Sequence, residues 1–205
     1  MKKELVCYCE YKFEADFPEE VDLAENAKAV QEILSGQFMV AQCPSCGKEL
    51  KPEFPFHLLN FNDGSDLYFI PELDRFKYIM GKYDLPVKDP YRVVIGYSEL
   101  VEKITIFRDE LQDQVIELVK YYLLNKALEE VDDDSEVEII FHGMENEKLI
   151  FHISGLKPDQ LAVTEIKLSM YEKLLGELPK RLTEQPFRDF LSPPYVSISR
   201  MFFDD

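Results

Sequence analysis

All four cysteines of the chain lie in its first quarter, as two close pairs. The first pair is Cys7-Tyr8-Cys9, and the second is Cys43-Pro44-Ser45-Cys46, which Gly47 follows. Four thiolates in two close pairs are a usual ligand set of a structural zinc ion. The pairs therefore predict one zinc site formed by Cys7, Cys9, Cys43 and Cys46. Such a site requires the N-terminal quarter to fold so that the two segments meet.

The geometry of the ion decides how each pair must be presented. A tetrahedral zinc with Zn–S bonds of ~2.3 Å places its sulfur atoms about 3.8 Å apart, so each pair must converge at a tight turn. Pro44 fixes φ after the first ligand of the second pair, and Gly47 permits the backbone conformation that often follows the last ligand. Cys7 and Cys9 are alternate residues of an extended segment, with Cα atoms ~6.6 Å apart, and converge if the strand bends.

The composition is that of a soluble, globular protein. The 205 residues are 46% hydrophobic and 13% aromatic, which is enough for an ordinary core in one domain or two. The sequence shows no secretory leader and no apolar run of about 18 residues, so we expect a cytoplasmic protein without a membrane segment. In a reducing cytoplasm, paired cysteines favour metal binding over disulfide formation.

The charge balance limits the class of partner. The chain has 40 acidic and 23 basic residues, a formal net charge of −17, and its Lys and Arg residues form no basic stripe. A phosphate backbone binds clustered cations, so no nucleic-acid binding is expected. The excess of acidic residues provides solubility and self-repulsion, and a protein is the expected partner. The sequence predicts neither the identity of this partner nor the oligomeric state.

Apolar patterning predicts the elements around the cysteines. The segment from Leu5 to Phe13 alternates as a strand and carries the first pair. A short helix is expected between the pairs, with Asp22 as its N-cap and Gly36 just past its end. These elements predict a zinc-ribbon-like sheet with a helix inserted between the two knuckles.

Downstream patterning predicts a mixed fold with a second small unit. The expected elements are a hairpin of 56–61 and 67–70 about the turn 62–65, a strand at 92–95, a helix at 99–107, a second helix at 110–129 capped by Asp109, a hairpin of 137–141 and 149–153, a strand at 161–168 and a short helix at 171–178. The acidic segment 129–136 predicts a domain boundary. We therefore expect an α+β fold in which a helical hairpin and a small α+β C-terminal unit follow the zinc-ribbon-like sheet, with domains at 1–129 and 130–205.

Three histidines are further candidate ligands. His57 lies close to the second knuckle and is the alternative to Cys9 as the fourth ligand, although a partly buried structural histidine is the simpler interpretation. His142 and His152 occur in the similar fragments 140–142 and 150–152. A four-residue turn at 144–147 would place them on opposite faces of the sheet, and a turn one residue longer or shorter would unite them. We interpret both as structural.

A family resemblance rests on three stretches of the chain. They are the two cysteine pairs together with 32–38, the stretch from 60–63 through 69–72, and 96–104 followed by Phe107. In these stretches residues 1–128 resemble the bacterial CpXC family. The resemblance implies a zinc-binding bacterial protein of uncharacterised function, with no reaction and no catalytic residues to transfer. The family pattern implies Cys-Pro-x-Cys at the first pair, where this chain has Cys7-Tyr8-Cys9.

Two functions follow from the cysteines. Four protein ligands leave no coordination position open, so one structural Zn²⁺ per chain is expected, in a protein with an interaction or scaffold role. The alternative is a thiol-disulfide oxidoreductase that uses Cys43 and Cys46, but Pro52 and Pro55 would interrupt the helix that such chemistry needs after its cysteines. No phosphate loop, Gly-x-Ser-x-Gly elbow or His-Glu-x-x-His motif occurs, so no catalytic residue is assigned. The sequence favours a binding protein over an enzyme and leaves open an enzyme of a type that has no motif here.

Overall fold

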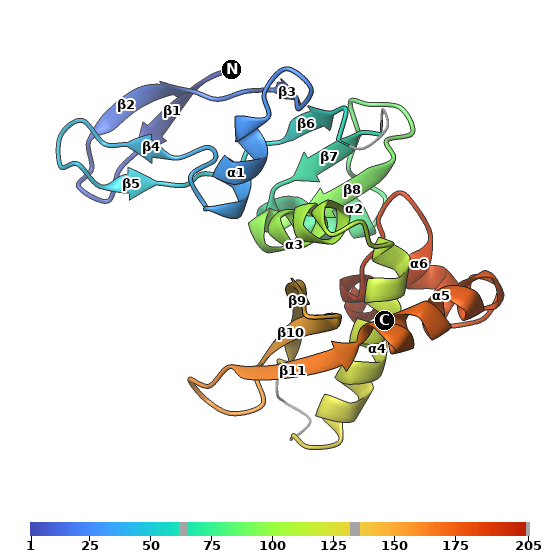
Figure 1. Cartoon of the computed structure of the whole chain (residues 1–205). Helices are drawn as coiled ribbons and strands as arrows, with labels where there is room; N and C mark the ends of the chain where they lie inside the picture. Colours follow the sequence, from blue (N-terminus) through green and yellow to red (C-terminus); the bar gives the residue numbers. More distant parts are fainter. Residues whose placement is uncertain (62–64, 132–135, 204–205) are drawn as a thin grey trace. The chain divides into compact units, whose positions relative to one another are not determined.

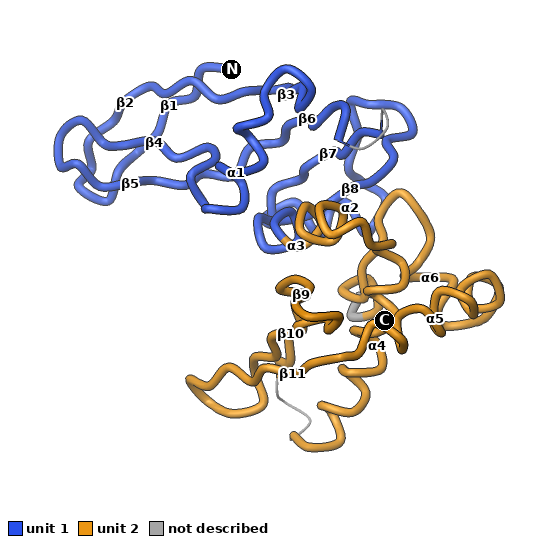
Figure 2. Tube along the Cα trace, viewed as in Figure 1, with its two compact units in different colours: residues 1–101 blue, residues 102–205 orange. Residues whose placement is uncertain are grey.

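The computed structural model describes residues 1–61, 65–131 and 136–203. The chain divides into two compact units, Met1–Val101 and Glu102–Asp205 (Figure 1, Figure 2). Both units contain helices and sheets, so the expected α+β class is confirmed. The boundary between the units lies inside a helix, and the predicted domains 1–129 and 130–205 stay a prediction. No helix in the described part of the chain is both long and apolar enough to cross a bilayer.

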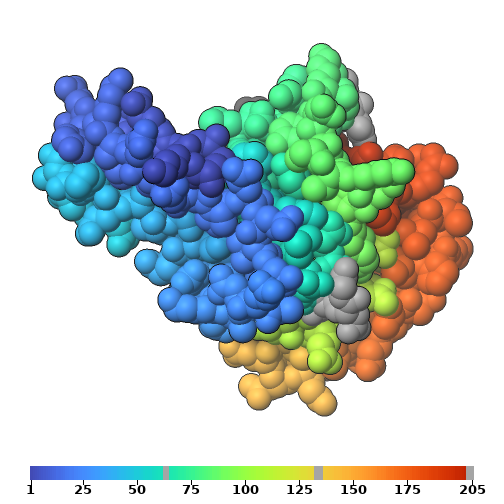
Figure 3. Space-filling view, turned by 90° about the horizontal axis from the view of Figure 1, so that it is seen from above, coloured from blue at the N-terminus to red at the C-terminus, as the bar shows by residue number. Residues whose placement is uncertain are grey.

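Two small antiparallel hairpins form the N-terminal part of unit 1. The first joins β1 (Lys2–Val6) to β2 (Lys12–Asp16), and the second joins β4 (Ala41–Gln42) to β5 (Glu49–Leu50). They lie side by side in two views, in dark blue and cyan (Figure 1, Figure 3). The single strand predicted from Leu5 to Phe13 is wrong. The chain reverses after Val6, because the first cysteine pair forms a turn and does not continue the strand.

A four-stranded sheet forms the core of unit 1. Its order is β3-β6-β7-β8, and only the central pair β6–β7 is antiparallel. The strands are β3 (Glu20–Asp22), β6 (Phe56–Leu59), β7 (Leu67–Ile70) and β8 (Arg92–Ile95). All residues of β7 and β8 are buried, as expected for strands covered on both faces. The predicted hairpin of β6 and β7 and the predicted strand at 92–95 are confirmed. The centre of the predicted turn, 62–64, lies outside the described residues.

The helix between the cysteine pairs is shorter than predicted. Helix α1 (Lys28–Leu34) ends where the sequence indicates, with Gly36 at φ 75°. Asp22 does not cap it. Its carboxylate accepts the backbone N–H of Ala24 and the side-chain amide of Asn60, so it stabilises the turn that precedes the helix. Asp22 therefore forms the local hydrogen bond that is typical of a helix cap, but no helix begins at this residue.

Two short helices precede the last strand of unit 1. The η1 turn (Glu72–Asp74) leads directly into α2 (Arg75–Ile79). Arg75 donates to Glu99 of α3 (Gly96–Arg108) over 2.8 Å and to the backbone carbonyl of Ile95 over 2.9 Å. The predicted helix at 99–107 is confirmed, and α3 crosses the boundary between the units.

Unit 2 is a three-stranded sheet packed on helices. The antiparallel strands have the order β11-β10-β9 and comprise β9 (Glu138–Glu145), β10 (Lys148–Ser154) and β11 (Ala162–Lys167). The inner face of β10 carries the buried side chains Leu149, Phe151 and Ile153. Helix α4 (Asp113–Leu128) contacts β9 and α5 (Leu168–Arg181), and α5 also contacts β11. The predicted hairpin and the third strand are confirmed.

The segments that close unit 2 differ in detail from the prediction. Helix α5 extends past both ends of the predicted 171–178, and it is followed by α6 (Phe187–Leu191) and η2 (Ile198–Phe203). Helix α4 begins at Asp113, after Gln112, whose backbone is extended. Asp109 does not cap the helix, and its carboxylate accepts the backbone N–H of Met144 over 3.0 Å. Half of the acidic segment predicted as a boundary, residues 132–135, lies outside the described residues.

A network of buried charges joins the helices of unit 2 to its C-terminal segment. Lys120 donates to Glu102 over 2.7 Å and to Glu117 over 3.1 Å. The second carboxylate oxygen of Glu117 accepts the backbone N–H of Ile198 over 2.8 Å. Lys103 donates to Asp113 and to the carbonyl of Val196, both over 2.9 Å. Every one of these side chains has a charged or backbone partner, which buried ions require.

Candidate metal centre

Each cysteine pair lies in the turn of one hairpin. In the second hairpin the backbone N–H of Cys43 donates to Lys48 over 2.8 Å, and that of Gly47 donates to Cys43 over 2.9 Å. Gly47 has φ 73°, so the left-handed backbone predicted after the last ligand is present. The side chain of Gln42 donates to the carbonyl of Gly47 over 3.1 Å and braces the turn. This arrangement points both thiols to one side of the turn.

The first turn is a shortened version of the second. Here the N–H of Cys7 donates to Tyr11 over 3.0 Å, and that of Glu10 donates to Cys7 over 2.8 Å. The two bonds match those of the second turn with one residue fewer between the cysteines. Glu10 occupies the position of Gly47 and has φ 67°, an uncommon conformation for a residue with a side chain. The bend that Cys7 and Cys9 require is therefore made by Glu10. Its role could not be predicted, because glutamate carries no signal for a left-handed backbone.

The two turns bring the four thiols together. All four Sγ atoms lie within 4.8 Å of one another. The Sγ of Cys7 lies 3.5 Å from that of Cys46, and the Sγ of Cys9 lies 3.8 Å from that of Cys43. All four cysteines are free of disulfides. Each close contact joins one knuckle to the other, so the cluster connects the two hairpins.

Burial divides the four cysteines into two kinds. Cys7 and Cys43 are 3% and 1% exposed, whereas Cys9 and Cys46 are exposed to solvent. The backbone N–H of Cys9 lowers the pKa of the Cys7 thiol, but burial and hydrogen bonds with the other three thiols raise it to about 12 overall. The backbone N–H of Tyr11, together with Cys46, lowers the pKa of the Cys9 thiol to about 7. The cluster thus contains one thiol that readily becomes a thiolate, the form that binds metals.

His57 lies outside the cysteine cluster. It is on β6, where its Nε2 atom lies 2.5 Å from Oδ2 of Asp66 and its Nδ1 atom lies 3.8 Å from Oε2 of Glu20. In the described part of the chain, the metal-ligating groups that converge are the four cysteines. His57 is therefore engaged with carboxylates in the four-stranded sheet, as the structural interpretation of this residue predicts.

His142 and His152 stack on each other on the sheet of unit 2. Their ring centroids are 4.1 Å apart, and the ring planes differ by 19°. The turn between β9 and β10 is tighter than four residues, with Lys148 opposite Glu145, and the register shifts between Ile150 and Phe151. This bulge brings the two rings to one face. The sequence did not predict the bulge, because a register shift has no marker in the pattern of apolar residues.

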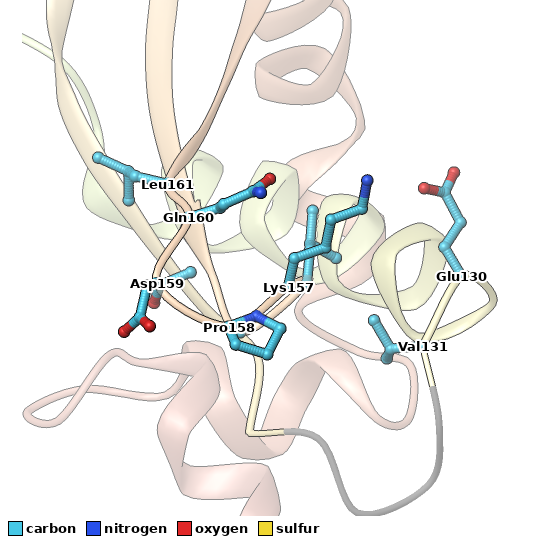
Figure 4. A pocket seen from close by; sticks show the side chains of 10 residues that line it. Glu130, Val131, Lys157, Pro158, Asp159, Gln160 and Leu161 are labelled. Carbon is cyan, nitrogen blue, oxygen red and sulfur yellow. The ribbon is translucent and has the colours of Figure 1, made fainter.

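A hollow of about 730 Å³ in unit 2 is a weaker candidate site than the cysteine cluster. It is lined by Glu130, Val131 and the loop 154–161 (Figure 4). The side chains of Lys157 and Asp159 point in different directions and do not converge on one ligand (Figure 4). The cysteine cluster therefore remains the candidate site.

Comparison with known proteins identifies the family. A family model described as CpXC protein matches residues 5–120, more than half of the chain and all four cysteines. The chain belongs to the CpXC family. This CpXC protein is also 26% identical over 223 residues to an uncharacterized protein of Treponema pallidum (strain Nichols), with 98% of this chain and 99% of the relative covered. No solved structure matches the chain.

The family match covers the part of the chain that contains the candidate site. The match begins within β1 just before Cys7, includes the rest of the two hairpins and the four-stranded sheet, and ends within α4. The resemblance stated from the sequence is therefore confirmed, and the second knuckle carries the Cys-Pro-x-Cys spacing. The first knuckle departs from that spacing, yet its thiols reach the same cluster. In both knuckles the residue that follows the last cysteine has a left-handed conformation, with φ 67° at Glu10 and φ 73° at Gly47.

Proposed function

We propose that this CpXC protein binds one structural zinc ion through Cys7, Cys9, Cys43 and Cys46. The observation that supports the proposal is the approach of all four Sγ atoms to within 4.8 Å of one another. A tetrahedral ion with Zn–S bonds of ~2.3 Å needs sulfur atoms about 3.8 Å apart, and the close contacts between the knuckles are 3.5 and 3.8 Å. The thiols are thus arranged at the separation that one ion requires.

The nature of the ligands favours zinc and a structural role. Soft thiolate ligands in a tetrahedral S₄ arrangement select zinc or an iron–sulfur centre, and hard cations such as Mg²⁺ and Ca²⁺ prefer oxygen. Four protein ligands fill the coordination sphere, so no position is left for a substrate or an activated water. The ion would hold the two hairpins together, and this is a structural task.

The role of the zinc-stabilised hairpins would be protein interaction or scaffolding in the cytoplasm. Apolar and aromatic side chains surround the first knuckle without being buried: Val6, Tyr8 and Tyr11 are 59%, 83% and 46% exposed. Aromatic residues of this kind are enriched in protein interfaces. The net charge of −17 opposes nucleic-acid binding, and it suits a protein partner. The metal would keep these side chains in place.

The alternative, a dithiol oxidoreductase, has weaker structural support. Such enzymes place the reactive cysteine at the N-terminus of a helix, where the dipole stabilises the thiolate. Cys43 and Cys46 instead lie in the turn between β4 and β5, and no helix begins there. Cys7 and Cys9 would also have no task in that chemistry. The geometry therefore favours the metal site.

Metal analysis of the purified full-length chain tests the proposal. We expect one zinc per chain, and we expect cobalt substitution to give the absorption bands of a tetrahedral thiolate site. Cys46→Ser should lower metal affinity at least about tenfold, whereas the matched variant Ser45→Ala in the same turn should retain it. A zinc-free protein in which the thiol of Cys43 or Cys46 is the unusually acidic, readily alkylated one would instead favour the oxidoreductase.

A further inference from the structure

The two edges of the sheet in unit 2 differ. At the β9 edge the backbone N–H of Phe141 donates to Glu102 over 2.6 Å, and that of Met144 donates to Asp109 over 3.0 Å. Side chains therefore block this edge. Strand β11 forms the other edge (Figure 1). Its backbone pairs with β10 on one side, and the described residues provide no partner on the other. An open edge of this kind can accept a further strand.

The register shows which groups of β11 face the open edge. The N–H of Leu168 donates to the carbonyl of Glu147 over 2.9 Å, in continuation of the pairing of Lys167 with Lys148. Backbone groups of an antiparallel strand alternate between its two sides. Those of Val163, Glu165 and Lys167 therefore point away from β10. These residues offer unused donors and acceptors at a regular spacing.

A groove lies beside this edge. It has a volume of about 600 Å³ and is formed by α4, α5 and the residues Thr164, Glu165 and Ile166 of β11. Its apolar wall includes Leu123 of α4 and Leu174 of α5. Two further lining residues, Tyr122 and Met170, are 39% and 48% exposed. A strand added to β11 would place alternate side chains against this wall, which is how strand addition acquires specificity.

The charges around the groove favour an acidic occupant. Glu165 is paired with Lys148, and Glu177 accepts from Arg181 over 3.1 Å. Lys126 and Lys173 also line the groove, and neither has an ion-pair partner among the residues that the structure describes. Arg181 has a buried Nε atom without a hydrogen-bond acceptor. The unused charge at the groove is thus positive, although the chain as a whole is strongly negative.

We propose that β11 and the α4–α5 groove bind an extended peptide of a partner protein, in which every second residue faces the groove and these residues include both apolar and acidic ones. The peptide pairs with the outward backbone groups of Val163, Glu165 and Lys167. The apolar and acidic side chains on one face of the peptide enter the groove, where the carboxylates reach Lys126 and Lys173. At physiological salt the screening length is about 8 Å, so these two lysines dominate the field at contact and the distant acidic residues contribute little.

A partner protein fits this surface better than a second copy of the chain. Two copies would bring two net charges of −17 together, and their self-repulsion opposes association. The proposal names the kind of partner for the interaction role given above and rests on that role. It does not rest on the metal, because all the residues involved belong to unit 2. Zinc content and peptide binding can therefore fail independently.

Binding of two synthetic peptides to the full-length chain tests the proposal. One has about eight residues, with valine and glutamate in turn at every second position and threonine between them, and the other has lysine in place of glutamate. Titration calorimetry should show the acidic peptide binding about tenfold more tightly than the basic one. Hydrogen exchange should slow at the amides of Val163, Glu165 and Lys167. The double variant Lys126→Glu/Lys173→Glu should reverse the order of the two peptides.

The variant Glu165→Pro tests the backbone contact directly. Proline removes an N–H that β10 does not use, and edge positions tolerate it. We expect it to weaken the acidic peptide at least about tenfold. The matched control Glu165→Gln loses the same ion pair with Lys148 but keeps the N–H, so it should bind the acidic peptide at least as tightly as the native chain does. Zinc content should be equal in all variants.

Three results would overturn the proposal. They are equal affinity for the two peptides, binding that Glu165→Pro leaves unchanged in a folded protein, and concentration-dependent dimerisation that Glu165→Pro abolishes. The last result would assign the edge to a second copy of the chain. Circular dichroism of each variant shows whether it is folded, and the double lysine variant provides the same test without a change in the backbone.

Discussion

Glu10 and Gly47 occupy equivalent positions in the two knuckles, and only one of them suits its conformation. Gly47 has φ 73°, and a Cβ atom there would meet nothing within 4 Å. Gly47→Ala therefore changes the backbone energy without a steric clash, and a side chain in a left-handed conformation costs about 1–2 kcal/mol. We expect this loss of stability for the zinc-loaded protein, measured by urea denaturation of the N-terminal hairpins.

Glu10→Gly tests the same argument in the opposite direction. Glycine relieves the strain at φ 67°, although the greater freedom of the unfolded chain offsets part of the gain. The expected result is stability equal to that of the native chain or up to about 1 kcal/mol higher. The backbone assignment of the first knuckle would be contradicted if Glu10→Gly destabilised the hairpin as much as Gly47→Ala.

Asp66 makes the stability of unit 1 depend on pH in the acid range. Burial alone would raise its pKa, but the backbone N–H of Tyr91 and the neighbouring His57 lower it overall. A carboxyl group whose pKa is lowered on folding stabilises the folded state above its unfolded pKa of about 3.9, and this stability is lost as the pH falls through the folded value. Asp66→Asn should therefore flatten the acid side of the stability profile of unit 1. Glu14→Gln, on the exposed side of β2, serves as the control and should not.

The cysteines could be predicted from the sequence and their supporting residues could not, for a physical reason. Thiolates bind zinc by virtue of their residue type, and close spacing places two of them at one turn. Glu10 acts through its backbone alone. His142 depends on a register shift that no single residue specifies. The chemistry of a ligand can be seen from the residue type, whereas a backbone conformation or a register shift cannot.

At the scale of elements, the buried charges of α3 and α4 are expected to be sensitive to substitution. Burial lowers the pKa of Lys120, but Glu102 and Glu117 hold it above its ordinary value overall. Lys120→Met would leave both carboxylates buried without their cation, which costs about 3–5 kcal/mol. Lys126→Met changes an exposed lysine of the same helix and should alter stability by less than about 0.5 kcal/mol. Thermal unfolding of the two variants provides the comparison.

The loss in Lys120→Met should also depend on pH. Burial raises the pKa of Glu117, so the folded state binds its proton more tightly than the unfolded state does. Stability from such a group increases as the pH falls through the folded pKa. The deficit of Lys120→Met should therefore shrink in acid. A deficit that is the same at all pH values would show that lost packing, and not uncompensated charge, is the cause.

Helices were predicted better at their apolar faces than at their ends. The expected helix 110–129 is present as α4, because apolar residues at helical spacing form its buried face and predict the helix. Its start differs from the prediction, since α4 begins at Asp113 and the carboxylate of Asp109 accepts a backbone N–H of β9 and does not cap the helix. Asp22 likewise stabilises a turn and not the start of α1. Capping residues form local hydrogen bonds, and tertiary partners decide which bond is made.

At the scale of the whole molecule, the α+β class can be predicted from the strand and helix patterns in the sequence. The division into two units cannot be predicted in this way. The units are defined by contacts, and their boundary at 101 and 102 lies inside the continuous helix α3. Nothing in the sequence of α3 marks that position. A boundary of this kind has no linker composition to reveal it.

The division of the chain predicts how it responds to loss of the metal. The hairpin of β4 and β5 has two residues in each strand, too few to be stable alone, and structural zinc contributes on the order of ten kcal/mol to the folding of such sites. A chelator should therefore accelerate hydrogen exchange in residues 2–16 and 41–50 while β9, β10 and β11 remain protected. Cys46→Ser should reproduce this pattern without a chelator. Equal loss of protection in both units would mean that they unfold together, and unchanged protection in the hairpins would mean that the cluster does not hold them.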